Sequence, residues 1–494
     1  LSPSCGVGTE VPSASAAISG STTGRRDIAG CTLPLGRPKW DNSTTRAPAA
    51  ASTAADFALG LAPEDVPDAA RRDAALMLLD TLGVAAAASP MEAGRIARDT
   101  ASLLYGSSDP AHRARMLFDG REASLAGAAY AAATQTDNLD AHDGYNPVKG
   151  HIGVAIIPAL LALAEQAEPM SGAEALMLVT LGYEIAGRAG LALHATVSDY
   201  HTSGAWNALG VAAMASRLRG LSAPQLREAI GIAEYHGPRS QMMREIANPS
   251  MLHDGSGWGA MVGISSTILA ERGFTGAPAI TVEAEEAASF WSDLGSRWIM
   301  QAQYVKPYPI CRWAHAPIDG VRDLMLAHGL GPDDIRHIQI NTFHESACLF
   351  QGVPDSTSMA QYSLSFAVAT QAVHGRIGVE QVSGDGLADT AVHAMIKRIS
   401  VAESDAHNAT FPHTRDADVQ ITLNDGRVLD SGLVHARGGS ERPMDESEII
   451  AKFEDYAAPV IGVDRARAIV AAVTGMADGT CGLDGLRAHL YAPT

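Results

Sequence analysis

Basic residues are scarce in this chain of 494 residues, where 36 Lys and Arg stand against 55 Asp and Glu and the formal net charge is −19. A protein that binds nucleic acid or an anionic membrane surface needs a broad basic face, so we expect neither partner. Long hydrophobic runs are also missing. The longest strongly apolar run, residues 152–164, is too short to cross a bilayer, and we predict no membrane span.

Cysteine is also rare and scattered. The five cysteines form no CxxC pair and show no metal-ligand spacing, a pattern typical of a reduced, cytoplasmic protein. The chain has no Walker loop, dinucleotide fingerprint, HExxH helix or nucleophile elbow either. These absences exclude the common nucleotide-binding, zinc-protease and serine-hydrolase classes.

The composition changes along the chain and predicts a mainly α fold. Residues 1–50 are rich in Ser, Thr, Gly and Pro, which favours a flexible extension. Residues 51–276 are Ala- and Leu-rich with helical spacing, which predicts a large all-helical domain. Residues 277–434 mix helical and alternating patterns, which predicts a smaller α+β lid domain. Residues 435–494 turn helical again, and we expect them to complete the first domain, making it discontinuous.

Two segments of the expected lid alternate apolar and polar residues as half-buried strands do. They cover residues 337–343 and 417–423, and the second leads into Asn424-Asp-Gly426, a hairpin turn signal. Helical spacing lies around them, at residues 318–328, 363–374 and 387–397. The pattern therefore predicts a small sheet with helices packed on it.

Positive charge gathers in one place in this acidic chain. Between residues 294 and 318 there are three basic residues and no acidic one, and the segment 306–315 (KPYPICRWAH) carries Lys306, Arg312 and His315. Its prolines keep the backbone out of a regular helix. Such an island favours a pocket for a carboxylate or phosphate. The alternative is a loop whose cations lie in solvent.

A second polar segment, residues 137–151, precedes the apolar helix expected from residue 152. At the start of that helix, His151 would meet exposed N–H groups and a dipole that disfavour a protonated imidazole. A neutral histidine beside a bound carboxylate is a credible general base near pH 7. The alternative is a polar loop with a capping aspartate. The candidate residues of this segment are Asp137, Asp140, His142, Tyr145, Lys149 and His151.

Two further histidines precede apolar helices. His201, in the segment Asp199-Tyr-His-Thr202, is either a helix cap or a catalytic group. His253 opens the segment HDGSGWG, which resembles a phosphate loop only weakly, because no strand precedes it and no GK[ST] follows. A metal site built from Asp140, His142 and His151 stays open by spacing alone.

Together these segments offer histidines, aspartates and a lysine, an inventory suited to proton transfer next to a carboxylate. Removing a proton α to a carboxylate builds negative charge on the carboxylate oxygens, which Lys, Arg or imidazolium donors must meet. We therefore expect the imidazole-bearing and the cationic segments to line one crevice.

At these segments the sequence resembles the MmgE/PrpD family, from about residue 54 to the C-terminus. Asp137-Asn-Leu-Asp-Ala-His142 is similar to the family's Asp-x-x-Asp-x-His stretch, and residues 306–315 resemble a family signature. Further similar segments are IIPALLALAE (156–165), DYHT (199–202), GSGWGAMVG (255–263), GFTG (273–276) and QYSLSFAVA (361–369).

The resemblance implies a large helical domain, closed by the C-terminal segment, with a smaller α+β lid. It also implies a homodimer without cofactor or metal, and an active site in the cleft between the domains. The family includes 2-methylcitrate dehydratase, cis-aconitate decarboxylase and iminodisuccinate epimerase. Matched by position, the residues placed in the cleft are Asp137, Asp140, His142, His151, His201 and Lys306.

The sequence departs from the decarboxylase-like members at three places. Its loop at residues 143–150 is longer, Ser250 stands where those members have an active-site lysine, and Phe366 where they have a tyrosine. A lost phenol and a lost ammonium would remove two polar contacts to a tricarboxylate. We therefore expect a substrate other than cis-aconitate.

The function predicted is a lyase that removes water from a small hydroxy di- or tricarboxylate. We expect His151 or His201 to take the α-proton, Asp140 to orient a histidine, and Lys306 and Arg312 to hold carboxylates. His142 is a further catalytic candidate. The remaining residues predicted to bind substrate are Asp137, Tyr145, Lys149, His253 and His315. Alternatives are an isomerase or epimerase, a decarboxylase using the same carbanion, and a non-catalytic acid binder.

Overall fold

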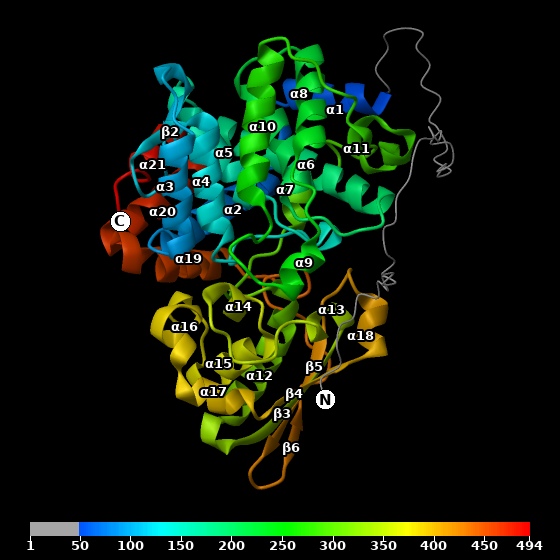
Figure 1. The fold of residues 1–494 in the computed structure, drawn as a ribbon, viewed down its shortest axis with the longest axis vertical. Helices are drawn as coiled ribbons and strands as arrows, with labels where there is room; N and C mark the ends of the chain where they lie inside the picture. The colour runs from blue at the N-terminus through cyan, green and yellow to red at the C-terminus, as the bar shows by residue number, and fades with distance from the viewer. Residues whose placement is uncertain (1–48) are drawn as a thin grey trace, which may run out of the picture. The chain divides into compact units, whose positions relative to one another are not determined.

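The structure, a computed structural model, describes residues 49–494. The expected N-terminal extension therefore lies outside the described residues, except for its last two positions. The described chain is helical over most of its length and contains one four-stranded sheet and one two-stranded ribbon (Figure 1). The prediction of a mainly α fold with a smaller α+β part is confirmed.

The helical part begins at residue 49 and continues to the cationic segment. It includes a short antiparallel ribbon of β1 (Arg113–Arg115) and β2 (Glu122–Ser124). Its helices are α1 (Ala49–Gly60), α2 (Asp68–Ala88), α3 (Glu92–Leu104), α4 (Leu125–Asp137), α5 (Gly153–Leu163), α6 (Gly172–Thr196), α7 (Gly204–Leu218), α8 (Ala223–His236), α9 (Met242–Ala247), α10 (Ser256–Glu271) and α11 (Ile280–Glu283).

Small residues let these helices pack closely around α7, which contacts α5, α6, α8 and α10. A Cβ atom added to Gly263 of α10 would lie 2.5 Å from Cβ of Val211 in α7, so the two backbones approach too closely for a larger residue. Such close helix contacts require small side chains, and the alanine-rich composition of residues 51–276 supplies them.

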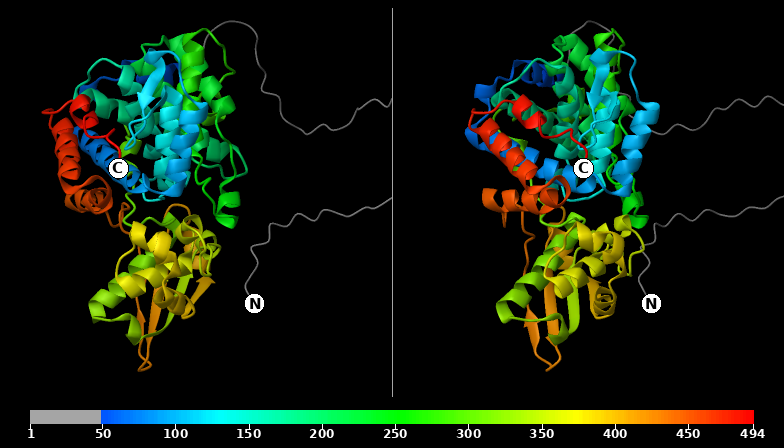
Figure 2. Two further views of the ribbon diagram at one scale, coloured as in Figure 1. Left: turned by 60° about the vertical axis from the view of Figure 1, so that its left-hand side comes forward. Right: turned by 90° about the vertical axis from the view of Figure 1, so that its left-hand side faces the viewer.

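The C-terminal helices are α19 (Glu446–Ile461), α20 (Val463–Ala477) and α21 (Leu483–Arg487). Helices α19 and α20 pack against α2, and both views of Figure 2 show the orange and red helices beside the blue one. Lys452 of α19 forms a buried ion pair with Asp80 of α2, with Nζ 2.5 Å from Oδ1. The boundaries predicted for the four segments stay predictions.

The α+β part holds the sheet, whose strand order is β4-β3-β5-β6. Strand β3 runs parallel to β4 and antiparallel to β5, with Ile340 paired to Val401 and to Val419. Its strands are β3 (Ile335–Thr342), β4 (Ile399–Glu403), β5 (Ala417–Leu423) and β6 (Val428–Asp430). Its helices are α12 (His315–His328), α13 (His344–Ala347), α14 (Thr357–Gln361), α15 (Leu364–His374), α16 (Val379–Val382), α17 (Thr390–Ile396) and α18 (Asp405–Thr410).

The alternating segments form the strands that their pattern predicts. Strand β5 covers residues 417–423 as expected, and it joins β6 through the predicted turn, where Gly426 has φ +93° and donates to the carbonyl of Leu423. The apolar face of β3 and β5 packs against α12 and α15, which lie beside the sheet in Figure 1.

One helix among residues 49–494, α6, is long and apolar enough to cross a membrane by composition alone. The rest of the protein buries 94% of its most apolar window. Helices α2 and α3 pass the same test only if they count as one span, although they are bent by 91°. A central core helix has these properties too.

Candidate functional site

An antiparallel bridge joins the loop after α4 to the segment that precedes Lys306. Gly144 donates to the carbonyl of Tyr304 at 3.0 Å, and Tyr304 donates back at 2.8 Å. A side chain at residue 144 would collide with the Tyr304 ring, so glycine is required at this approach. The bridge brings together two segments that lie 160 positions apart in the sequence, and the cationic segment begins two residues later.

Lys306 and Asp140 form a buried ion pair. The ammonium nitrogen lies 2.5 Å from Oδ1 of Asp140 and also donates to its backbone carbonyl at 3.0 Å. Lys306 is 0% and Asp140 3% exposed. Burial is the largest single influence on the pKa of Lys306 and acts to lower it, but Asp140, Tyr304 and Cys311 together outweigh burial and raise that pKa. Asp140 has φ +53°, a left-handed backbone conformation that is uncommon outside glycine. The main chain therefore turns sharply at the residue that carries this carboxylate.

His151 lies just before α5, as the sequence predicts. Its Nδ1 lies 2.6 Å from the carbonyl oxygen of Asp143, which can only accept, so Nδ1 carries the proton. Its Nε2 then has a free lone pair and lies 3.6 Å from Oδ2 of Asp254. Burial, followed by the positive charge of Lys306, holds the pKa of His151 well below 6.5. A neutral imidazole with Nε2 unprotonated can act as a base.

Behind His151 lies a second imidazole, that of His142. The two rings meet edge to face with their centroids 4.6 Å apart, and His142 is fully buried. Its Nε2 lies 3.4 Å from Oδ1 of Asp137. Burial lowers the pKa of His142 to about 4 and raises that of Asp137 to about 7. His142 supports the position of His151 and has no surface on a cavity.

A small cavity lies between the helical part and the cationic segment. Its volume is about 20 Å³, enough for one water molecule, so a substrate can enter only if the cavity widens. Five of the predicted residues line it: Asp140, Lys149, His151, Lys306 and Arg312.

Three cations that line this cavity have no acidic partner within residues 49–494. Lys149 lies over the ring of Tyr200, with Nζ 4.3 Å from its centroid. Arg312 donates to the backbone carbonyls of residues 437 and 436, at 2.5 and 3.1 Å. Arg415 donates to the hydroxyl of Tyr304 at 3.5 Å and to a backbone carbonyl at 3.3 Å.

Burial lowers the pKa of Lys149, and it lowers that of Arg312 to about 10. Charged groups that are buried without a counter-ion are costly, and an anion in the cavity would reduce that cost. The cavity therefore suits a ligand with several negative charges.

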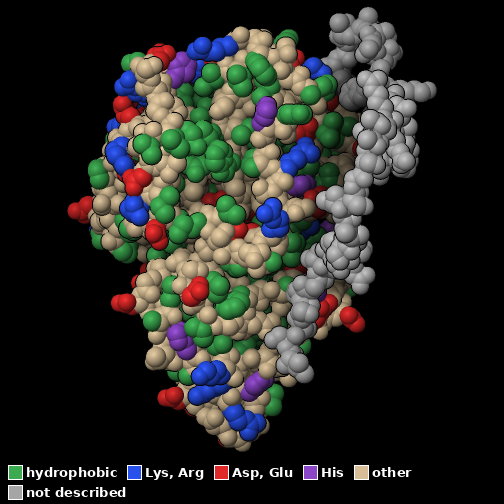
Figure 3. Space-filling model, in the orientation of Figure 1, with side chains coloured by type: hydrophobic (Ala, Val, Ile, Leu, Met, Phe, Trp, Pro, Cys, Tyr) green, Lys and Arg blue, Asp and Glu red, His purple; other side chains and the backbone are tan. Residues whose placement is uncertain are grey.

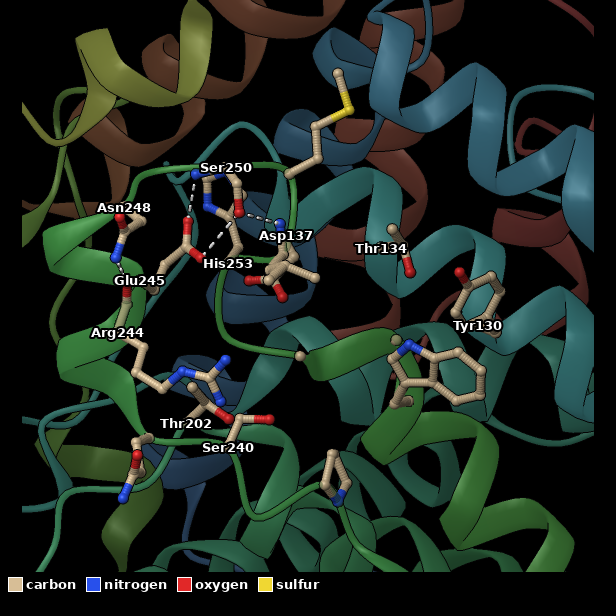
Figure 4. A pocket seen from close by; sticks show the side chains of 17 residues that line it. Tyr130, Thr134, Asp137, Thr202, Ser240, Arg244, Glu245, Asn248, Ser250 and His253 are labelled. Atoms are coloured by element: carbon tan, nitrogen blue, oxygen red, sulfur yellow. Dashed lines mark hydrogen bonds between the residues drawn. The ribbon is translucent and has the colours of Figure 1, made fainter. Parts of the chain in front are cut away.

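Helix α9 separates this cavity from a larger one of about 540 Å³. Met242 and Ile246, four residues apart, line the small cavity, whereas Arg244 and Glu245 line the large one (Figure 4). The predicted residues Asp137 and His253 line the larger cavity. The sequence-predicted set is thus divided between two neighbouring cavities.

Four predicted residues line neither cavity: His142, described above, and His201, His315 and Tyr145. The Nε2 atom of His201 lies 3.5 Å from Oδ1 of Asp199, and that of His315 lies 2.9 Å from the carbonyl oxygen of Ile310. Tyr145 is buried in the helical core. The roles predicted for these residues stay predictions, and His151 is better placed than His201 to meet a ligand.

Sequence reasoning missed several side chains of the small cavity. Arg415 has no local signal, because it precedes a strand among acidic residues of the α+β part. Tyr200 and Asp254 are the sequence neighbours of the predicted residues His201 and His253. The residues missed are Tyr200, Asp254, Tyr304, Tyr362 and Arg415.

The positions where the sequence departs from the decarboxylase-like pattern lie away from the small cavity. Ser250 lines the larger cavity and donates its backbone N–H and its hydroxyl to Glu245, at 2.7 and 3.1 Å. Phe366 is fully buried in the core of the α+β part. In the described part of the chain, no group of three or more His, Cys, Asp or Glu is arranged to hold a metal ion.

Comparison with known proteins matches both parts of the chain to one family. The MmgE/PrpD N-terminal domain matches residues 52–293, and the MmgE/PrpD C-terminal domain matches residues 308–477. The cis-aconitate decarboxylase of Aspergillus terreus is 23% identical over 464 residues, which cover 85% of this chain and 91% of that protein. Those of Mus musculus and Homo sapiens are 24% and 22% identical, over 71% of this chain and 75% and 76% of their own.

Proposed function

Because the chain belongs to the MmgE/PrpD family, we propose that it is a cofactor-independent lyase that removes a proton next to a carboxylate of a di- or tricarboxylate. One observation carries the proposal. A neutral imidazole with an available Nε2 lies at a cavity lined by three cations that have no acidic partner within residues 49–494. That combination matches the charge that develops when such a proton leaves.

In the proposed reaction His151 is the base. Its Nδ1–H donates to the carbonyl of Asp143, which fixes the tautomer, and Nε2 takes the α-proton. Asp254 lies 3.6 Å from Nε2 and would stabilise the imidazolium that forms. Ser203 holds this carboxylate, since its hydroxyl and backbone N–H both donate to Oδ1 of Asp254, at 2.7 and 3.1 Å.

The cations around the cavity bind the substrate's carboxylates in this proposal. Lys149, Arg312 and Arg415 are each able to donate to a carboxylate oxygen. As the α-proton leaves, electron density moves onto the adjacent carboxylate, and the cations stabilise that density more strongly than in the ground state. Such differential binding lowers the barrier to proton removal.

For dehydration the reaction then needs an acid, and Lys306 is placed to act as one. Two of its three N–H bonds are directed at Asp140, which leaves one for the substrate. The C–O bond breaks, the leaving hydroxide takes a proton from the ammonium, and water and an unsaturated polycarboxylate are released. Solvent then takes the α-proton from His151 and returns a proton to the amine of Lys306, which restores both groups for the next turnover.

Decarboxylation is the second candidate, and the relatives favour it, since those compared above are cis-aconitate decarboxylases. In that reaction a C–C bond to a carboxylate breaks, CO₂ leaves, and the carbanion takes a proton. At 22–24% identity the substrate and the reaction can differ. Ser250 and Phe366, which replace two polar side chains of the decarboxylase-like pattern, lie away from the small cavity, so they do not decide which substrate binds there.

Proton NMR in D₂O distinguishes these reactions. The protein is mixed with a panel of hydroxy- and unsaturated polycarboxylates, and the substrate and product signals are followed. We expect loss of water with formation of a new vinyl signal. Loss of CO₂ would select decarboxylation, and exchange of the α-proton for deuterium alone would select an epimerase or isomerase. Thermal stabilisation by a polycarboxylate without exchange or product would reject catalysis and leave an acid binder.

A further inference from the structure

Tyr304 is a buried tyrosine of the small cavity that the proposed reaction does not use. Its side chain is 2% exposed and lines the cavity together with His151 and Lys306. It lies in the loop that precedes α12, two residues before Lys306. The contacts of this phenol show whether it serves the fold alone or also a ligand.

The backbone of Tyr304 is fixed relative to the proposed base. Its bridge with Gly144 joins it to the loop in which the carbonyl of Asp143 holds Nδ1 of His151. A Cβ atom added to Gly144 would lie 2.3 Å from the Tyr304 hydroxyl oxygen and 2.9 Å from Nδ1 of His151. The centroids of the two rings are 6.3 Å apart. The phenol and the imidazole therefore both lie next to one glycine, with no side chain of residue 144 to separate them.

Two guanidinium groups lie over the Tyr304 ring. The Cζ atom of Arg312 is 4.6 Å from the ring centroid, and that of Arg415 is 5.7 Å from it. The π face of an aromatic ring attracts a guanidinium within about 6 Å, but it leaves the N–H groups free to bind an anion. The ring thus holds both cations at the cavity without neutralising them.

This gathering of cations is not general on the molecule. On the face that Figure 3 shows, Lys and Arg side chains are dispersed, and several lie beside acidic ones. Arg312 and Arg415, by contrast, are only 4% and 5% exposed and have no acidic partner in the described part of the chain. Burial of unpaired charge is costly, so the arrangement around Tyr304 indicates an anionic ligand.

The hydroxyl group of Tyr304 has a donor to offer to that ligand. Its oxygen accepts from Nη1 of Arg415 at 3.5 Å. A phenol also donates one hydrogen bond, and within residues 49–494 the Tyr304 O–H has no acceptor. Tyr308, four residues later, differs in this respect, because its hydroxyl donates to Oδ1 of Asp319 at 2.8 Å. Tyr304 therefore presents an uncommitted O–H beside two cations.

We propose that Tyr304 is a further catalytic residue of the small cavity, whose O–H donates to the substrate carboxylate on which negative charge develops. Its ring holds Arg312 and Arg415 beside the same carboxylate. As the α-proton moves to His151, a fixed O–H donor stabilises the growing charge more strongly than it stabilises the ground state. The tyrosine keeps its proton throughout, and Lys306 remains the acid. This role rests on the proposed function and adds a neutral donor to it.

The substitution Tyr304→Phe tests this role, because it removes the hydroxyl and keeps the ring. Deuterium incorporation at the α-carbon is measured on the full chain with the substrate found by NMR. We expect kcat for exchange to fall about 100- to 1,000-fold, the usual cost of losing one donor to a developing oxyanion. KM should rise less, about 3- to 10-fold, and the thermal transition should change little. An unchanged exchange rate would overturn the proposal.

Two further variants separate the hydroxyl from the ring and from burial. Tyr308→Phe is the matched control, since Tyr308 is also buried but lines neither of the two cavities, and it should exchange at the unsubstituted rate. Tyr304→Leu removes the ring as well, and its KM should be about 10-fold above that of Tyr304→Phe, because two guanidiniums lose their support. Loss of exchange in Tyr308→Phe as large as in Tyr304→Phe would overturn the assignment to Tyr304.

Calorimetry with propane-1,2,3-tricarboxylate separates this role from the proposed function. The tricarboxylate should bind the unsubstituted protein and bind Tyr304→Phe about 3- to 10-fold more weakly. Binding that weakens in Arg415→Met but not in Tyr304→Phe, with exchange unchanged in Tyr304→Phe, would overturn the role of Tyr304 and leave the lyase proposal intact. A lack of exchange in the unsubstituted protein with every polycarboxylate of the panel would overturn both.

Discussion

Lys306 and Asp140 are 166 positions apart in the sequence, yet the ammonium of one lies 2.5 Å from the carboxylate of the other, and both are buried. This ion pair joins the loop after α4 to the cationic segment that precedes α12. It places the ammonium at the small cavity, next to His151. The pair therefore serves both the structure around the cavity and the proposed chemistry, and substitutions have to separate the two contributions.

Replacing Lys306 by Met is expected to abolish turnover and to destabilise the protein. The substitution leaves Asp140 buried without a partner, which typically costs about 3–5 kcal/mol. The double variant Lys306→Met/Asp140→Leu removes both charges and should recover most of the stability but none of the turnover. Thermal unfolding and the D₂O assay measure the two properties. Turnover in the stable double variant would contradict the role proposed for Lys306.

Lys452 provides a matched control for this experiment. It forms the same kind of buried pair, with Asp80 at 2.5 Å, and donates to the carbonyl of Ala141 at 2.7 Å, but it lines neither cavity. Lys452→Met should lower stability by a similar amount and keep turnover when assayed well below its unfolding temperature. A loss of turnover as complete as in Lys306→Met would mean that any buried ion pair here is required, whatever its position.

Arg415 is expected to bind a substrate carboxylate. Arg415→Met should raise KM about 10- to 100-fold with a smaller effect on kcat, because it removes a charge-assisted contact present before the transition state. Arg427, an exposed arginine paired with Asp425 at the β5–β6 turn, is the control, and Arg427→Met should behave as the unsubstituted protein. The KM values are measured by steady-state kinetics on the substrate found by NMR. Equal KM values in the two variants would show that Arg415 does not bind a substrate carboxylate.

His151 and His201 are the two histidines proposed as the base. His151→Asn should slow α-proton exchange by about 100- to 10,000-fold, the usual contribution of a general base. His201→Asn should have the smaller effect, because His201 lines neither cavity. Deuterium incorporation at the α-carbon measures both. The opposite order of effects would transfer the role of base to His201.

Stability should fall on acidification, and His253 allows the effect to be measured at one residue. Burial lowers the pKa of His253 to about 3, below the value near 6.5 of an unfolded chain. Between these values the unfolded state binds the extra proton, so this residue's contribution is lost as the pH falls below 6.5, by up to about 1.4 kcal/mol per pH unit.

The variant His253→Asn suits this measurement because asparagine tolerates the left-handed backbone at residue 253. Between pH 7.5 and pH 5.5 the unfolding temperature of the variant should drop less than that of the unsubstituted protein. Parallel curves over this range would show that His253 is as easily protonated in the folded state as in the unfolded one.

The sequence predicts the regular parts of this fold well. Strand β5 and the Gly426 turn follow from alternation and turn chemistry within a few residues, which are local signals. Strand β4 has no such signal. It is short and mostly half-buried or exposed at the sheet edge, so its alternation is weak, and only its parallel pairing with β3 defines it.

The candidate site is predictable only where chemistry and local pattern coincide. His151 stands out because an apolar helix follows it, and Lys306 because it lies in a cationic island. Arg415 reaches the same cavity through the tertiary fold alone, since it donates to the hydroxyl of Tyr304, 111 positions away in the sequence. The division of the predicted residues by α9 also depends on packing, and no spacing in the sequence encodes it.

A crystal structure of the protein with propane-1,2,3-tricarboxylate, which has no hydroxyl group to eliminate, tests the central claim most directly. We predict that the small cavity widens, that Lys149, Arg312 and Arg415 bind the carboxylates, and that a carbon of the ligand lies within reach of Nε2 of His151. The central claim would be contradicted by a tricarboxylate bound elsewhere while Lys306 stays paired with Asp140 and the small cavity keeps its volume.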